Sequence, residues 1–121
     1  MTLVTEDAGI RALFLGDLGK IGQAGILAAE VPSPVEIVKV AHHGSANQSP
    51  DLYAALAARI GLISVGAAND YGHPTDRALS LLRDAGTAIA RTDRSGMLLI
   101  APAADGQLRL WTERTGTAPA P

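Results

Sequence analysis

The chain has 121 residues, which suffices for one domain, and 47% of them are hydrophobic. It contains no cysteine, so disulfides and thiolate zinc sites are excluded, and His, Asp and Glu remain as possible metal ligands. The formal net charge of −2 gives no general attraction to nucleic acid, so any DNA contact has to be local or made through a metal. Apolar runs are too short to cross a bilayer and no signal peptide follows Met1, which predicts a soluble segment.

The first third of the chain predicts a strand, a helix and a second strand. Residues 10–15 form an apolar run that stops at Gly16, which is typical of a buried strand followed by a tight turn. Residues 19–29 are helix-like although they contain three glycines, each of which costs about 1 kcal/mol relative to alanine. Residues 35–41 alternate and are rich in β-branched side chains, so they predict the next strand.

The middle of the chain repeats this order. Ser49 is a good N-cap and is followed by Pro50, so a helix is expected to run to about residue 58. Residues 60–65 predict a strand, and residues 66–74 have the composition of a loop.

The last third predicts a helix and then short strands. Thr75 caps the helix, which runs to about residue 85 before Gly86 ends it. The predicted strands cover residues 87–91, 97–101 and 107–112, with a TDRSG turn after the first of them. We expect one layered α/β domain over residues 1–115 and a disordered tail over residues 116–121.

Polar groups follow three of the predicted strands. Asp17 follows the first strand, His42 and His43 follow the second, and His73 lies in the loop after the third. Ligand sites of open α/β sheets gather outside the carboxyl ends of the strands, so these segments are expected to face one site. Carboxylate and imidazole groups together suit zinc or manganese.

Each of these residues also has a purely structural interpretation. Asp17 after a glycine is the usual composition of a turn or a helix cap. His42 and His43 can be one packed ring and one solvated ring, and His73 before a proline can belong to a rigid turn. Taken singly, these residues do not establish a site.

A combination of four segments in fixed order specifically resembles that of one protein family: LFLGD, IVKVAHHGSANQS, LISVGAANDYGHP and RTDRSG. Together they resemble the C-terminal half of the metallo-β-lactamase-like domain of the ComEC family of DNA-uptake proteins. The likeness covers residues 11–99, which is most of the chain. It implies that the fold is the C-terminal half of an αβ/βα sandwich.

The resemblance also implies roles for individual residues. Asp17 and His43 match two later ligands of a centre of two zinc or manganese ions, with Asp17 as the bridge. His42, beside His43, is a packing neighbour or the alternative ligand. His73 matches a loop histidine able to neutralise a phosphate or protonate a leaving oxygen. Plausible substrate-binding residues are Ser45, Asn69, Tyr71 and Arg94, although Asp93 beside Arg94 equally suits a salt-linked turn.

The implied activity is hydrolysis of a phosphodiester, with single-stranded DNA as the substrate proposed for such domains. The HxHxDH motif that supplies most of the family's metal ligands is absent here. We therefore expect a fragment, inactive alone, of a bacterial cytoplasmic-membrane protein, with the rest of its own domain and a membrane channel as partners. Alternatives are a hydrolase of small phosphodiesters and a non-catalytic assembly module. Apolar strand faces also predict a homodimer.

Overall fold

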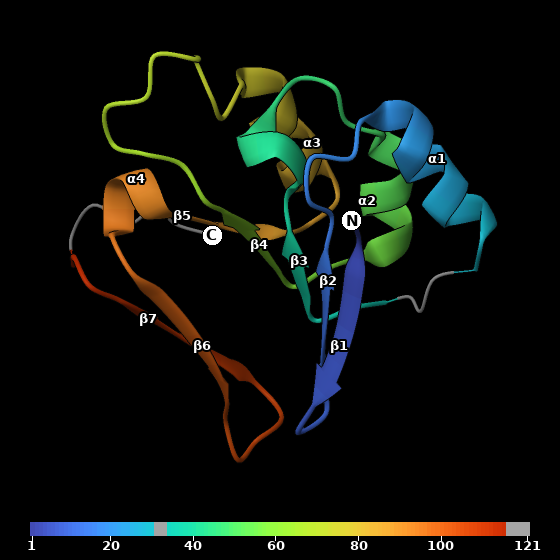
Figure 1. The fold of residues 1–121 in the computed structure, drawn as a ribbon. Helices are drawn as coiled ribbons and strands as arrows, with labels where there is room; N and C mark the ends of the chain where they lie inside the picture. The colour runs from blue at the N-terminus through green and yellow to red at the C-terminus, as the bar shows by residue number, and fades with distance from the viewer. Residues whose placement is uncertain (31–33, 116–121) are drawn as a thin grey trace.

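A computed structural model describes residues 1–30 and 34–115 of the chain (Figure 1). The expected disordered tail, residues 116–121, lies outside the described residues. None of the helices in the described ranges has the length and apolar character needed to span a membrane.

A five-stranded sheet forms the centre of the domain. Its strands stand side by side in chain order: β1 (Leu3–Asp7), β2 (Ile10–Phe14), β3 (Ile37–Lys39), β4 (Ile60–Ile63) and β5 (Ala88–Arg91). The β1 strand is antiparallel to β2, and the other neighbours are parallel. Parallel strands need crossover connections, and here each crossover contains a helix.

Three helices lie on one side of this sheet (Figure 1). They are α1 (Lys20–Ala28), α2 (Pro50–Leu56) and α3 (Asp76–Asp84). The hydroxyl of Ser49 accepts a hydrogen bond from the Leu52 N–H at 3.4 Å, and that of Thr75 accepts one from the Ala78 N–H at 3.2 Å. Both predicted N-caps are therefore confirmed, and they fix where α2 and α3 begin.

Alternation along the strands divides the sheet into two unlike sides. Leu13, Val38 and Ile63 point toward the helices and have no exposed surface. Phe14 points the other way, opposite Leu3 of β1, and these two side chains are 39% and 51% exposed. We call the side that carries Leu3 and Phe14 the open side.

The remaining elements are short. A single 3-10 turn, η1 (Ala41–Gly44), follows β3, and a one-turn helix, α4 (Thr92–Ser95), follows β5. The chain then forms a hairpin of β6 (Leu98–Pro102) and β7 (Leu108–Thr112). Arg59 ties the hairpin tip to the sheet through the Gly106 carbonyl at 3.1 Å and the Gln107 side chain at 2.7 Å.

The predicted α/β class is confirmed, and three details differ from the sequence expectations. The β1 strand was not expected, because its five residues are all exposed and do not form an apolar run. The strand predicted over residues 35–41 pairs only over β3, since Val40 and Ala41 already turn into η1. The expected TDRSG turn is a helical turn, α4.

Candidate functional site

The carboxyl ends of β2 and β3 are joined directly at one edge of the sheet. The His42 N–H donates to the Gly16 carbonyl at 2.9 Å, and the Leu15 N–H donates to the Lys39 carbonyl at 3.4 Å. Asp17 therefore follows a residue that is hydrogen-bonded to the double-histidine segment. The sheet register places the GD and HHG segments next to each other, although 24 residues lie between positions 17 and 42 in the sequence.

Residues 42–44, the double-histidine loop, have an unusual backbone. His42 and His43 have φ of 46° and 54°, and Gly44 has φ of 81°. Consecutive non-glycine residues in the left-handed region are uncommon, because each costs free energy that the surroundings must offset. Such backbone conformations cluster at functional sites, which makes this loop a candidate for function.

The loop that precedes α3 is fixed against the double-histidine loop. The Gly44 carbonyl accepts hydrogen bonds from the Thr75 N–H at 2.9 Å and from its hydroxyl at 3.2 Å. A Cβ atom at Gly44 would lie 2.6 Å from the Cβ of Pro74, so only glycine permits this approach. In the same loop, the Asn69 side chain accepts a hydrogen bond from the His73 N–H at 3.3 Å.

These connections bring the chain's three histidines together. The His42 ring centroid lies 6.2 Å from that of His43 and 5.7 Å from that of His73, and the Tyr71 ring lies 6.4 Å from His73. A cavity of about 160 Å³ opens beside them, lined by His43, Val65, Gly66, Asn69, Tyr71 and His73. Tyr71 is 84% exposed, so its ring stands at the rim where a ligand can reach it.

The hydrogen bond of His43 identifies which of its ring nitrogens carries a proton. Its Nδ1 atom lies 2.6 Å from the Ser64 carbonyl oxygen. A carbonyl oxygen only accepts hydrogen bonds, so Nδ1 is the protonated nitrogen and the neutral ring keeps its lone pair on Nε2. Metal-binding histidines typically have this arrangement, in which one ring nitrogen donates to a backbone carbonyl and the other nitrogen is oriented toward the metal.

A lysine on the open side lies close to Asp17. Burial lowers the pKa of Lys39, and the negative charge of Asp17 offsets part of that effect. The Lys39 ammonium also donates to the Val40 carbonyl at 3.0 Å. Lys39 therefore supplies a positive charge near the GD segment.

Two predicted substrate-binding residues lie away from the cavity lining. Ser45 is 7% exposed, and its hydroxyl accepts a hydrogen bond from Gln48 at 3.4 Å, so it faces the interior beneath the loop. Arg94 lies in α4, which Thr92 attaches to the end of β4 by two hydrogen bonds of 2.8 Å with Val65. Asp93 forms a paired contact with Arg91, at 3.0 and 2.6 Å, as expected for a salt-linked turn.

The donors in this region do not complete a metal site by themselves. Across residues 1–30 and 34–115, no three His, Asp or Glu side chains are grouped closely enough to hold an ion. Asp17 and His43 carry the right donor atoms, and the His43 ring has the right orientation. Structural zinc sites use four ligands and catalytic sites three, so further donors are needed.

Three residues beneath the double-histidine loop had not been singled out from the sequence. Gln23, Gln48 and Tyr53 are 0%, 1% and 1% exposed and share one hydrogen-bond network. Glutamine is usually a surface residue, so its identity gave no signal. The one local signal that Gln48 has a structural role is its position directly before Ser49, the N-cap of α2.

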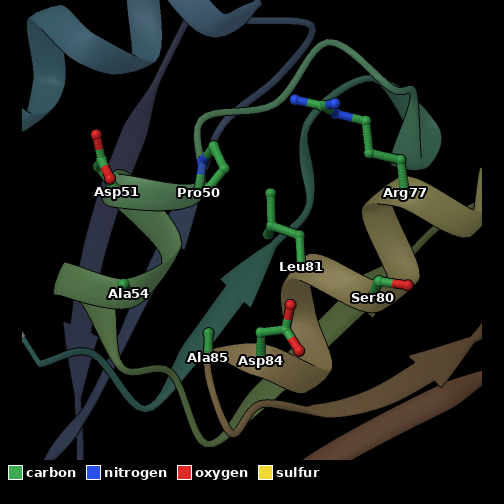
Figure 2. A pocket seen from close by; sticks show the side chains of 8 residues that line it. All are labelled: Pro50, Asp51, Ala54, Arg77, Ser80, Leu81, Asp84 and Ala85. Carbon is green, nitrogen blue, oxygen red and sulfur yellow. The ribbon is translucent and has the colours of Figure 1, made fainter.

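A second cleft lies on the helix side of the sheet, between α2 and α3 (Figure 2). It has a volume of about 420 Å³ and is flanked by Asp51 of α2 and by Arg77 and Asp84 of α3. No histidine lines it. This cleft therefore offers an acidic comparison surface, on other elements than the histidine cluster.

The chain is similar to part of a known protein. Over 99 residues, which are 81% of this chain, the sequence is 29% identical to ComE operon protein 3 of Bacillus subtilis (strain 168). The matched segment is only 13% of that protein, so the chain spans a small part of its relative's length. No family model matches the chain, and no solved structure matches it. The likeness connects the chain to a competence-operon protein.

Proposed function

We propose that this chain forms the strand-end part of a metal-dependent phosphodiester-hydrolysing site in a DNA-uptake protein. In this proposal it is the C-terminal half of a metallo-β-lactamase-like sandwich, as the resemblance to the ComEC family implies. The main support is that backbone hydrogen bonds join the GD segment to the HHG segment and join HHG to Thr75, directly after the GHP segment, so that all three histidines gather at one sheet edge. The likeness to ComE operon protein 3 supports the competence context.

Asp17 and His43 are the proposed metal ligands of the chain. The Nε2 lone pair of His43 is available because Nδ1 donates to Ser64, and Asp17 is exposed at the neighbouring strand end. The other donors come from outside this chain, in the segment where the family carries its HxHxDH motif. When bound, zinc or manganese ions would supply an activated water and a Lewis acid.

The side chains around the cavity are the proposed substrate contacts. His73 is half-buried between His42 and Tyr71, where a protonated imidazole can donate to a phosphate oxygen or to a leaving oxygen. Asn69 and Tyr71 line the same cavity. We propose single-stranded DNA as the substrate, because the exposed Tyr71 ring offers a base a surface on which to stack.

The open side of the sheet is the proposed contact for the rest of the domain. Leu3 and Phe14 are exposed there, and the β6–β7 hairpin exposes Leu99 and Trp111, which are register partners. A second sheet packed on the open side would bury such residues, as in other layered domains. The same packing would bring the missing metal ligands to the strand-end edge.

Paramagnetic broadening by Mn²⁺ tests the ligand assignment even where binding is weak. In a nuclear magnetic resonance titration of the chain, the signals of Asp17 and of residues 42–44 should broaden at the lowest Mn²⁺ concentrations. The His43→Ala variant should lose this selective broadening, because one of two proposed donors is gone.

The α2–α3 cleft provides the internal control. Asp51 and Asp84 bind Mn²⁺ only as ordinary surface carboxylates, so their signals should broaden later and equally in the wild type and in His43→Ala. Broadening that starts at Asp51 and Asp84, or that His43→Ala leaves unchanged, would reject Asp17 and His43 as ligands.

A further inference from the structure

A buried polar network lies directly beneath the double-histidine loop. Its members come from different elements: Gln23 from α1, Gln48 from the segment before α2, and Tyr53 from α2. All three side chains are at most 1% exposed. Burying this many polar atoms is unfavourable unless each has a hydrogen-bond partner, so the partners of the network indicate its role.

The network forms hydrogen bonds with the backbone of Ala41, the residue that precedes the two histidines. The Gln48 Nε2 donates to the Ala41 carbonyl at 2.9 Å, and the Ala41 N–H donates to the Tyr53 hydroxyl at 3.3 Å. The Tyr53 hydroxyl in turn donates to the Gln48 Oε1 at 2.8 Å. Ala41 is therefore held through both of its backbone polar groups by two side chains that also bond to each other.

Gln23 anchors this arrangement to α1. Its Nε2 donates to the Gln48 Oε1 at 2.9 Å and to the Leu18 carbonyl at 2.6 Å, while its Oε1 accepts from the Ser49 N–H at 2.8 Å. Every donor and acceptor of both amides is used, which fixes the orientation of each group. Burial also raises the pKa of Tyr53 to about 12, so its hydroxyl stays protonated and able to donate.

The residues after Ala41 are the ones under backbone strain. His42 and His43 are both left-handed, and the His43 ring reaches the Ser64 carbonyl of the neighbouring strand. Such a conformation persists only where the surroundings determine it. Gly44 and Thr75 hold the loop from the far end, and the network holds it from the near end.

We propose that Gln23, Gln48 and Tyr53 are positioning residues that set the tautomer of His43. By fixing Ala41, they keep His42 and His43 left-handed, which keeps the His43 Nδ1–H on the Ser64 carbonyl and leaves the Nε2 lone pair facing outward. This inference rests on the proposed function only for the use of that lone pair. The tautomer itself belongs to the chain without any ligand.

Nitrogen-15 spectra of the histidine rings test this directly, because they distinguish an Nδ1–H from an Nε2–H imidazole. Spectra are recorded on the metal-free chain at alkaline pH. The wild type should show His43 as the Nδ1–H tautomer. In Gln48→Leu and in Tyr53→Phe, the ratio of the Nδ1–H to the Nε2–H tautomer of His43 should fall by about tenfold, because a hydrogen bond to the Ala41 backbone is lost.

A core variant separates positioning from stability. Leu82 of α3 has no exposed surface and lies outside the network, so Leu82→Ala destabilises the fold but should leave the His43 tautomer unchanged. Tyr53→Phe keeps the ring and removes only the hydroxyl, so it decides the question if Gln48→Leu does not fold. An Nε2–H tautomer in the wild type, or a wild-type ratio in folded Tyr53→Phe, would overturn the proposal.

These outcomes are independent of the metal. A wild-type Nδ1–H tautomer that Tyr53→Phe abolishes, together with no selective Mn²⁺ broadening, would support the positioning role and reject the metal-binding function. Selective broadening with a tautomer that Tyr53→Phe leaves unchanged would support the metal-binding function and reject the positioning role.

Discussion

The two sides of the five-stranded sheet differ in how completely the chain covers them. Toward the helices, Leu13, Val38 and Ile63 are fully buried against side chains of α2 and α3. On the open side the coverage is uneven: Ile37 and Ile60 are only 8% exposed, whereas Leu3 and Phe14, at the β1 edge, keep 51% and 39% of their surface exposed. Leu13 and Phe14 are neighbours in β2 and point to opposite sides of the sheet, so the buried core and the exposed surface meet within one strand.

This contrast distinguishes the part of the core that the chain completes by itself from the apolar surface that is available for contact with another protein segment. The helix side buries the strand side chains that face it and contains the hydrogen-bonded Gln23–Gln48–Tyr53 network under the histidines. The open side exposes large apolar side chains, a property that usually marks an interface. The candidate site lies at the edge between the two sides. The network that contacts Ala41 lies on the helix side, and in the proposed function the further metal ligands would come from the open side.

The largest expected effect tests this difference within β2. Leu13→Ala should lower the free energy of unfolding by about 2–5 kcal/mol, because it leaves a cavity in a closed core. Phe14→Ala should cost much less, since its ring is already partly in water. Urea denaturation of both variants measures the two changes, and equal losses would show that the open side is packed as firmly as the helix side.

The next effect concerns association through the open side. We predict that the chain forms a homodimer at micromolar concentration. At about 25 cal/mol per Å², an interface of about 800 Å² per partner offers enough free energy to offset the entropy of association. Phe14→Lys should return the chain to a monomer, because it places a charge in that interface. Sedimentation equilibrium measures both states.

The matched control for association is Ile21 of α1. Its side chain is 91% exposed, but it lies on the helix side, so Ile21→Lys should leave the dimer intact. A wild-type chain that sediments as a well-folded monomer would contradict the prediction. A dimer that Ile21→Lys disrupts and Phe14→Lys does not would move the interface to the helices.

The smallest effect concerns acid and the ion pair at the end of β5. Burial acts to raise the pKa of Asp93, but the hydrogen bonds and charge of Arg91 outweigh it, so the pKa is lowered. The pair therefore stabilises the fold above the unfolded value of about 3.9, and this contribution is lost as pH falls through the folded value.

Asp93→Asn tests this contribution. At neutral pH the variant should be less stable than the wild type by about 1–3 kcal/mol, because the largely buried Arg91 loses the charge of its hydrogen-bonding partner. Below the pKa of Asp93 the two proteins should unfold at the same urea concentration. A difference that persists in acid would mean that Asp93 acts through packing rather than through its charge.

The sequence predicted those elements whose signals are local. Ser49 with Pro50 and Thr75 with Gly86 marked the limits of α2 and α3 closely, because caps and terminators act within a few residues. The β1 strand escaped prediction because it is an exposed edge strand, held by pairing with β2 rather than by apolar contacts of its own.

The site could be predicted only in outline. Strand-end positions predicted Asp17 and the three histidines as site residues. The structure joins the GD and HHG segments by a hydrogen bond and joins HHG to Thr75, directly after GHP. The left-handed backbone of His42 and the network of Gln48 depend on contacts between residues distant in sequence. Such contacts leave no periodicity or spacing from which they can be inferred.

A chimera tests the functional claim most directly, since it supplies what would cover the open side. In Bacillus subtilis, this chain replaces the matched segment of ComE operon protein 3, and transformation by added DNA is measured in cells with equal protein levels. We predict that the chimera supports transformation and that Asp17→Ala or His43→Ala lowers it by about tenfold or more. A functional chimera that transforms equally well with either substitution would contradict the proposed site.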